Sequence, residues 1–263
     1  MKVPGSFRIE FLGPPGVGKS TLYQALLPRL EKTPGIIGAP DLAPRAALSA
    51  SRRTGLRKAM EHFRAEYAPA FIREPYRQRL EARIAPQAEH AVAAMENVDG
   101  FLALCFQALA RQDDGTLRVK RAKWLVNGLR QAALADMIYG RELVVFDELL
   151  CQSGFGLGLH DAASGDAWRD YFAVVPAPRA VVAPNGSERV IVERLSQRES
   201  PGSRHLETIE AGARFREIAL ETLDRRGVEI YEPSTDLSRT DAEALLTWLQ
   251  GQTEPRFTNA PAE

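Results

Sequence analysis

A glycine-rich segment near the start of the chain has the residue types that hold a phosphate group. Residues 13–20 read Gly-Pro-Pro-Gly-Val-Gly-Lys-Ser and match the pattern G-x-x-x-x-G-K-[ST] at every fixed position. Glycines let successive backbone N–H groups turn toward one point, which creates an anion site. The lysine of this pattern reaches the β- and γ-phosphates of a nucleotide, and the hydroxyl is a ligand for Mg²⁺. We therefore predict an ATP site with Mg²⁺ formed by Gly13, Pro14, Pro15, Gly16, Val17, Gly18, Lys19, Ser20 and Thr21.

Two adjacent acids follow an apolar run later in the chain. Leu143–Phe146 is typical of a short buried strand, and Asp147 and Glu148 come directly after it. Ligands bind at the carboxyl edge of open α/β sheets, so these carboxylates are expected beside the glycine-rich segment. Asp147 is the first candidate for a metal ligand, together with Ser20, or for the base that accepts a hydroxyl proton. Glu148 is its partner or the alternative base.

Basic residues are concentrated between Arg45 and Arg83, where ten of them occur with four acids. One interpretation is a solvated helical surface, which is the ordinary reason for such a charge pattern. The other is a surface that holds an anionic substrate, since arginine binds phosphate and carboxylate through paired hydrogen bonds. The sequence leaves both open.

A second group of arginines lies in residues 188–204. A helix from Glu188 places Arg194 and Arg198 one turn apart on the same face, and Arg204 follows a segment with proline and glycine. Phosphoryl transfer benefits from arginines that arrive as a site closes over the phosphate. A surface helix with salt bridges is the alternative.

Alternating strands and helices must position these groups. Short apolar runs predict strands at residues 7–12, 143–146, 180–183 and 228–231, with a shorter one around residues 36 and 37. Helical patterns predict helices at residues 20–32, 117–139, 206–226 and 241–250, and Gly227 stands where a glycine ends a helix. Residues 45–111 have helical spacing that Pro69, Pro75 and Pro86 should break. Strands separated by helices predict an α/β protein with a parallel sheet covered on both faces.

Composition excludes several classes of protein. The 263 residues include 34 basic and 34 acidic side chains and are 44% hydrophobic, which is a globular composition. Balanced charge argues against broad nucleic-acid binding, and no apolar run approaches the ~18 residues that span a bilayer. Without a secretory pattern at the N-terminus, we expect a cytoplasmic protein with no nucleic-acid or membrane partner. Cys105 and Cys151 are expected as reduced thiols in the core.

The order of these features resembles that of P-loop kinases, in particular the thymidylate kinase and deoxynucleoside kinase group. The resemblance covers most of residues 7–235 and rests first on the glycine-rich segment, a P-loop. Residues 144–157 (VVFDELLCQSGFGL) are similar to the family's strand followed by an acid, although Glu148 stands where an arginine often occurs. Residues 178–198 (PRAVVAPNGSERVIVERLSQR) are similar to the strand, loop and helix that precede the family's lid.

The resemblance implies a P-loop NTPase fold in one domain over residues 1–252, with 253–263 as a tail. It also implies a helical acceptor region at residues 45–140 and an arginine-bearing lid at 196–205. Phe106, Gln107 and Arg111 are similar to a helix on which deoxynucleoside kinases read the base with a glutamine. The candidate acceptor-binding residues are Asp41, Arg45, Arg73, Arg77, Phe106, Gln107 and Arg111.

The expected activity is transfer of the γ-phosphate of ATP to a hydroxyl or phosphate of a nucleoside, nucleotide, sugar or related metabolite. The acceptor can be anionic, and a homodimer is compatible with the sequence. The candidate catalytic residues are Lys19, Asp147, Glu148, Arg194, Arg198 and Arg204. The alternative is a P-loop ATPase or nucleotide switch, in which Glu148 activates water and hydrolysis drives a partner.

Overall fold

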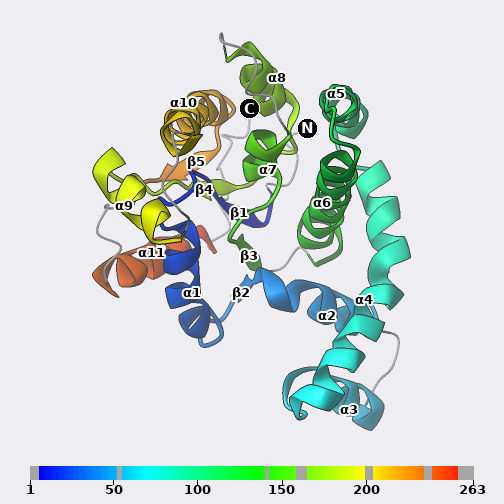
Figure 1. Ribbon diagram of the computed structural model, residues 1–263. Coiled ribbons are helices and arrows are strands. Elements are labelled where there is room, and N and C mark those ends of the chain that lie inside the picture. The colour runs from blue at the N-terminus through cyan, green and yellow to red at the C-terminus, as the bar shows by residue number, and fades with distance from the viewer. Residues whose placement is uncertain are drawn as a thin grey trace, which may run out of the picture.

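The computed structural model of the chain describes residues 6–51, 55–139, 142–157, 165–198, 204–233 and 239–253. These residues build a five-stranded sheet with the strand order β2-β3-β1-β4-β5, and every neighbouring pair is parallel. Figure 1 shows helices on all sides of this sheet. The strands are β1 (Arg8–Phe11), β2 (Ile36–Gly38), β3 (Leu143–Phe146), β4 (Ala180–Val182) and β5 (Glu229–Tyr231).

The α/β class and the parallel sheet are confirmed, and β1, β3, β4 and β5 lie within one residue of their predicted bounds at each end. Ile9 of the central strand β1 pairs with Val145 on one side and with Ala180 on the other. Because all strands run in the same direction, the segments that follow β1, β2 and β3 leave the sheet at one edge.

Helices connect the strands. Those before β3 are α1 (Lys19–Leu30), α2 (Ala39–Ser49), α3 (Gly55–Glu66), α4 (Ala70–Ala93), α5 (Val98–Ala110) and α6 (Gly115–Ala133), and a π-helical turn, η1 (Leu134–Tyr139), follows α6. Those after β3 are α7 (Leu150–Gly156), α8 (Asp166–Val174), α9 (Glu188–Arg198), α10 (Arg204–Arg225) and α11 (Arg239–Gln252). The sequence predicted neither α7 nor α8.

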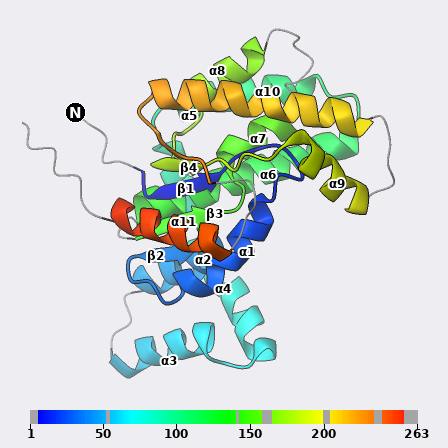
Figure 2. The ribbon, with the colours of Figure 1, turned by 90° about the vertical axis from the view of Figure 1, so that its left-hand side faces the viewer.

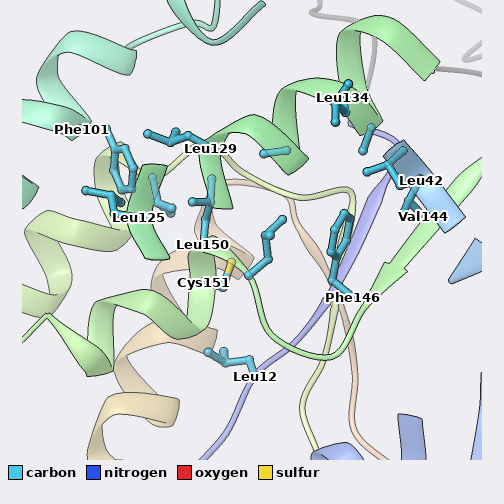
Figure 3. Close-up of a cluster of buried hydrophobic side chains, with 14 of the residues drawn as sticks. Leu12, Leu42, Phe101, Leu125, Leu129, Leu134, Val144, Phe146, Leu150 and Cys151 are labelled. Atoms are coloured by element: carbon cyan, nitrogen blue, oxygen red, sulfur yellow. The ribbon is translucent and has the colours of Figure 1, made fainter. Parts of the chain in front are cut away.

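Side chains of the strands alternate between two hydrophobic cores, one on each face of the sheet. Val144 and Phe146 of β3 face the larger core, where Leu129 of α6 and Leu150 of α7 lie nearby (Figure 3). Val145 faces the smaller core, which is formed mainly with α1 and α11. The predicted coverage of both faces is therefore confirmed.

The expected break of the helix at Pro75 and at Pro86 is wrong, because α4 continues through both prolines. Each proline removes one backbone donor, but burial of Leu80 and Ile84 against the core holds the helix in place. Pro69 does mark a boundary, since it immediately precedes α4. No single described helix has the length and apolar character needed to cross a bilayer; α4 and α5 have them only jointly, across a 100° bend.

Gly227 ends α10 as predicted. Its φ of 75° lies in the left-handed region, and its N–H donates to Asp224 O at 2.8 Å. The N–H of Val228 donates to Leu223 O at 3.0 Å, which completes the usual glycine-ended helix terminus. This arrangement turns the chain directly into β5.

A buried ionic network links β1 to the helices around it. Arg8 and Glu10 are fully buried, and their side chains pair at 3.1 Å. Arg8 Nε also pairs with Asp136 of η1 at 2.7 Å, while Glu10 Oε2 accepts a 2.7 Å hydrogen bond from the Cys151 N–H. Cys151, like Cys105, is an unpaired buried thiol, as predicted. Burial raises the pKa of Glu10, and Arg8 lowers it in part.

We predict that Arg8→Met lowers the free energy of unfolding by about 3–5 kcal/mol, because it leaves the Glu10 carboxylate buried without its cation. The double variant Arg8→Met/Glu10→Gln should recover part of this loss, since glutamine still accepts from the Cys151 N–H without a charge. Urea denaturation measures both variants.

The loss in Arg8→Met should also be larger at pH 7 than at pH 5. The pKa of Glu10 is higher in the folded protein than in the unfolded chain. Between these two pKa values the folded state binds more protons, so the free energy of unfolding falls as the pH rises through this range. Removal of Arg8 raises the pKa of Glu10 further, because Arg8 lowers it, and so extends this pH range upward. Equal stability of wild type and Arg8→Met at both pH values would contradict this account.

Candidate functional site

The Gly13–Ser20 loop joins β1 to α1, and two of its glycines adopt left-handed backbone angles. Gly16 and Gly18 have φ angles of 80° and 99°, in the left-handed region that glycine adopts without strain. Such residues next to ordinary ones gather backbone N–H groups into a concave site. Gly18 immediately precedes α1, so the positive end of the helix dipole adds to the loop.

Lys19 is buried beneath this loop, with 5% of its surface exposed. Its Nζ donates to Gly13 O at 2.8 Å and to Pro14 O at 3.2 Å, and it pairs with Glu148 Oε1 at 3.3 Å. Burial lowers the pKa of Lys19, and the carboxylates of Glu148 and Asp147 raise it in part. The ammonium is therefore held between the loop and the end of β3.

Asp147 lies next to Ser20, where the sequence predicted a metal site. Burial raises the pKa of Asp147, whereas a hydrogen bond with the Ser20 side chain and the charge of Lys19 lower it. Its Oδ1 atom is buried and makes no hydrogen bond within the described residues. A buried carboxylate oxygen of Asp147 without a hydrogen-bond donor, beside the hydroxyl oxygen of Ser20, fits a Mg²⁺ ion, which prefers oxygen ligands.

The donor set is small, which also suits Mg²⁺. Among the described residues, no group of three or more His, Cys, Asp or Glu side chains could hold a metal ion by itself. Mg²⁺ is usually bound through one or two protein oxygens, with waters and substrate phosphates completing the coordination. Ser20 and Asp147 match that requirement, whereas Glu148 is occupied with Lys19 and its side chain is 54% exposed.

Helices α9 and α10 pack against the loop, the second through Ile209 and Gly212. Ile191 of α9 packs with Val17, and Arg194 Nη1 donates to Val17 O at 3.1 Å. A Cβ atom on Gly16 would lie 2.9 Å from Leu195 Cγ. The candidate Arg194 thus contacts the loop itself and holds one of its carbonyls.

Two residues that the sequence did not indicate also position the site. Gln152 of α7 accepts a hydrogen bond from the Gly13 N–H through Oε1 at 3.1 Å. Tyr23 of α1 donates to Val145 O at 3.2 Å and accepts from the Ala39 N–H at 3.2 Å, which joins α1 to the ends of β3 and β2. Burial raises the pKa of Tyr23 to about 12. No local pattern distinguishes these side chains, because their partners are distant in sequence.

Asp41 and Arg77 are brought together at the same edge of the sheet. Asp41 lies in the first turn of α2, directly after β2, and pairs with Arg77 of α4 at 2.9 Å. The Tyr23 hydroxyl bonds both to Val145 O of β3 and to the N–H of Ala39, two residues before Asp41, so this pair lies near the end of β3.

Other arginines of the basic region also have acidic partners. Arg45 pairs with Glu142 at 3.8 Å, and Arg73 pairs with its neighbour Glu74 at 3.3 Å. Part of the local positive charge is therefore balanced within the protein. This finding favours the interpretation of a salt-bridged helical surface for these two positions.

The remaining candidates are not joined to the loop. Phe106, Gln107 and Arg111 are exposed on or just after α5, whose buried face packs against α6 and α8. Arg198 and Arg204 end α9 and begin α10, but their side chains, like residues 199–203, lie outside the described part of the chain. The predicted lid at 196–205 is thus largely outside the description.

We predict that Gly16→Ala weakens nucleotide binding at least about tenfold, because a left-handed alanine costs about 1–2 kcal/mol and its Cβ would meet Leu195. Calorimetric titration with ATP measures the change. Gly115→Ala is the matched control, since a Cβ there meets nothing within 4 Å. Adding Leu195→Ala should relieve only the steric part. Wild-type affinity in Gly16→Ala would refute the role of the loop.

Comparison with known proteins adds no assignment to this geometry: no protein-family model matches the chain, and no curated protein matches it.

Proposed function

We propose that the protein has a P-loop NTPase fold and is an Mg²⁺-ATP-dependent phosphotransferase that acts on a small-molecule acceptor. One observation carries the proposal: the Gly13–Ser20 loop, the buried Lys19 and the Ser20–Asp147 pair meet where β1 and β3 end. A phosphate-binding loop beside a carboxylate at this edge is what phosphoryl transfer needs for positioning and charge neutralisation.

In this proposal Lys19 neutralises the β- and γ-phosphates of ATP. Its ammonium lies within hydrogen-bond distance of Gly13 O and Pro14 O, so a modest movement of the side chain exchanges carbonyl partners for phosphate oxygens. Glu148 must release the same ammonium, because a carboxylate and a phosphate compete for it. Backbone N–H groups of the loop hold the phosphates in line with the acceptor.

Ser20 and Asp147 would hold Mg²⁺, which supplies charge compensation on the phosphate oxygens when bound. Without the ion, the Ser20 hydroxyl stabilises the Asp147 carboxylate that burial disfavours. The Glu148 carboxylate, half exposed at the mouth of the site, is then the group placed to accept a proton from an acceptor hydroxyl. This division assigns different roles to two neighbouring acids.

The acceptor is proposed to bind at the end of β2, near Asp41 and Arg77. The Arg77 guanidinium also donates a hydrogen bond to the carbonyl of Pro40, in the first turn of α2. An arginine with one carboxylate partner retains further N–H donors for an anionic group. Arg194 donates a hydrogen bond to Val17 O and so contacts the Gly13–Ser20 loop directly.

Hydrolysis is the second candidate activity, and the exposed position of Glu148 favours it, because the same carboxylate could activate water. ADP formation measured with and without candidate acceptors separates the two. A kinase consumes ATP substantially faster when its acceptor is present, with phosphorylated acceptor formed in equal amount. Acceptor-independent ATP consumption at the full rate would support the ATPase.

We predict that Asp147→Asn lowers kcat by roughly 10²-fold or more and raises the Mg²⁺ concentration required for activity, since an amide is a weaker ligand than a carboxylate. Glu148→Gln should lower kcat without changing the Mg²⁺ requirement, and should tighten ATP binding because Lys19 loses a competing partner. Rates measured across a Mg²⁺ series distinguish the variants. A full-rate Asp147→Asn protein with an unchanged Mg²⁺ requirement would remove Asp147 from the metal site and contradict the proposed division of roles.

Arg77→Ala should raise KM for an anionic acceptor several-fold while leaving the affinity for ATP unchanged. Arg79→Ala is the control, because that side chain is exposed on the same helix. Initial rates over a range of acceptor concentrations provide the comparison. Unchanged KM in both variants would remove Arg77 from the acceptor site and leave it as a structural partner of Asp41.

A further inference from the structure

Helix α3 turns its apolar side away from the protein. Leu56, Met60, Phe63 and Tyr67 are 77%, 47%, 58% and 68% exposed, and they recur at the spacing of one helical face. The N–H of Tyr67 donates to Phe63 O at 2.8 Å, so the helical geometry extends to this residue. We call these four side chains the α3 stripe.

The opposite side of α3 contacts the rest of the chain through an acid and small residues. Glu61 is 4% exposed and pairs with Arg83 of α4 at 3.3 Å, and Ala65 is 1% exposed. An amphipathic helix ordinarily buries its apolar face. Here the Glu61–Arg83 pair holds the polar side of α3 against α4, so the apolar stripe faces the solvent.

The stripe lies at an accessible end of the molecule. Figures 1 and 2 both show α3 at the end of the molecule remote from the sheet, beyond α2 and much of α4. Phe71, in the first turn of α4, is 78% exposed. Buried aromatic side chains cover about 150–250 Å² each, so Phe63, Tyr67 and Phe71 alone leave on the order of 300–500 Å² uncovered. With Leu56 and Met60 added, the exposed apolar area reaches the upper end of what the largest patch of a monomer usually covers, a size that is often functional.

We propose that the α3 stripe is a homodimer interface, in which α3 packs antiparallel against α3 of a second copy around a twofold axis. The spacing of the stripe is four, three and four residues, and it reads the same in both directions. An antiparallel pair centred between Glu61 and His62 therefore places Leu56 opposite Tyr67 and Met60 opposite Phe63. Each aliphatic side chain meets an aromatic one, and the seam has the alternating spacing that helices use to interlock.

A parallel pair fits less well. It would set Phe63 against Phe63 and Leu56 against Leu56, so large side chains would coincide at one end. It would also place Arg57 beside Arg57 of the second copy, and like charges at that distance repel. In the antiparallel pair the two Arg57 residues are nine positions apart along the seam, or about 13 Å.

Charge also favours a second copy over an anionic membrane. Arg73, Arg77 and Arg83 of α4 pair with Glu74, Asp41 and Glu61. These three arginines of α4 are therefore neutralised within the protein, which leaves Arg57 and Arg64 of α3 as the exposed arginines that flank the stripe. An interface of ordinary size buries about 800 Å² on each partner. The α3 stripe, with the side chains around it, can approach this area.

Sedimentation equilibrium of the full chain tests the interface. We expect a dimer at about 10 μM and above, and expect Phe63→Glu to weaken association at least about 30-fold, as loss of a central anchor does. Trp124→Glu is the matched control, because Trp124 is 59% exposed on α6 outside the stripe. Circular dichroism confirms that each variant is folded. A monomeric wild type, or a dimer that Phe63→Glu leaves intact, would overturn the proposal.

Disulfide trapping tests the antiparallel direction. A mixture of Leu56→Cys and Tyr67→Cys chains should form cross-linked pairs on mild oxidation, whereas Leu56→Cys alone should not, since its copies are about 16 Å apart along the seam. The native cysteines are buried and provide a low background. Efficient cross-linking of Leu56→Cys alone would show a parallel pair and overturn the proposed geometry.

Co-sedimentation with vesicles of phosphatidylcholine and phosphatidylserine tests the other occupant. A dimer that stays in the supernatant supports the proposal. A monomer that pellets through Phe63 would replace it with membrane binding. None of these measurements depends on catalysis, so the dimer proposal and the proposed phosphotransferase activity can fail separately.

Discussion

The arrangement of the site depends on how the protein accommodates the buried ammonium of Lys19. A cation removed from water requires close partners, and the structure supplies two loop carbonyls and the Glu148 carboxylate. These contacts require the Gly13–Ser20 loop to curl over the lysine, and they require β3 to end beside β1. The register between Glu10 and Phe146 satisfies the second condition by placing Asp147 and Glu148 at the mouth of the loop.

Two further sets of contacts keep this geometry in place. On one side, Gln152 and Tyr23 tie the loop and α1 to the chain after β3 and β2. On the other side, Ile191 and Arg194 of α9 pack on or bond to Val17. A glycine is consequently needed at position 16 for two reasons. The residue adopts a left-handed backbone angle, and a Cβ atom there would collide with Leu195.

Sequence reasoning predicted the strands well because each is a short apolar run with a polar residue or turn at its end. It also brought Lys19, Ser20, Asp147 and Glu148 into one prediction, since a parallel sheet places strand ends together. It failed where the outcome depends on distant partners. Pro75 and Pro86 should break a helix locally, yet burial of Leu80 and Ile84 maintains α4. Similarly, the pattern of α3 predicts an apolar face but not its direction, which the Glu61–Arg83 pair determines.

Helix α4 links the two proposals physically. Phe71 lies at its exposed start, whereas Arg77 lies six residues later and pairs with Asp41 at the edge of the sheet, about 9 Å farther along the helix. Arg83 of the same helix pairs with Glu61 of α3, so α4 carries both the contact with α3 and the Arg77 side chain. A second copy held against α3 would therefore restrict the position of Arg77. The part of the chain between β2 and β3 would then serve both as acceptor-binding region and as dimer contact, with α4 as the element common to both.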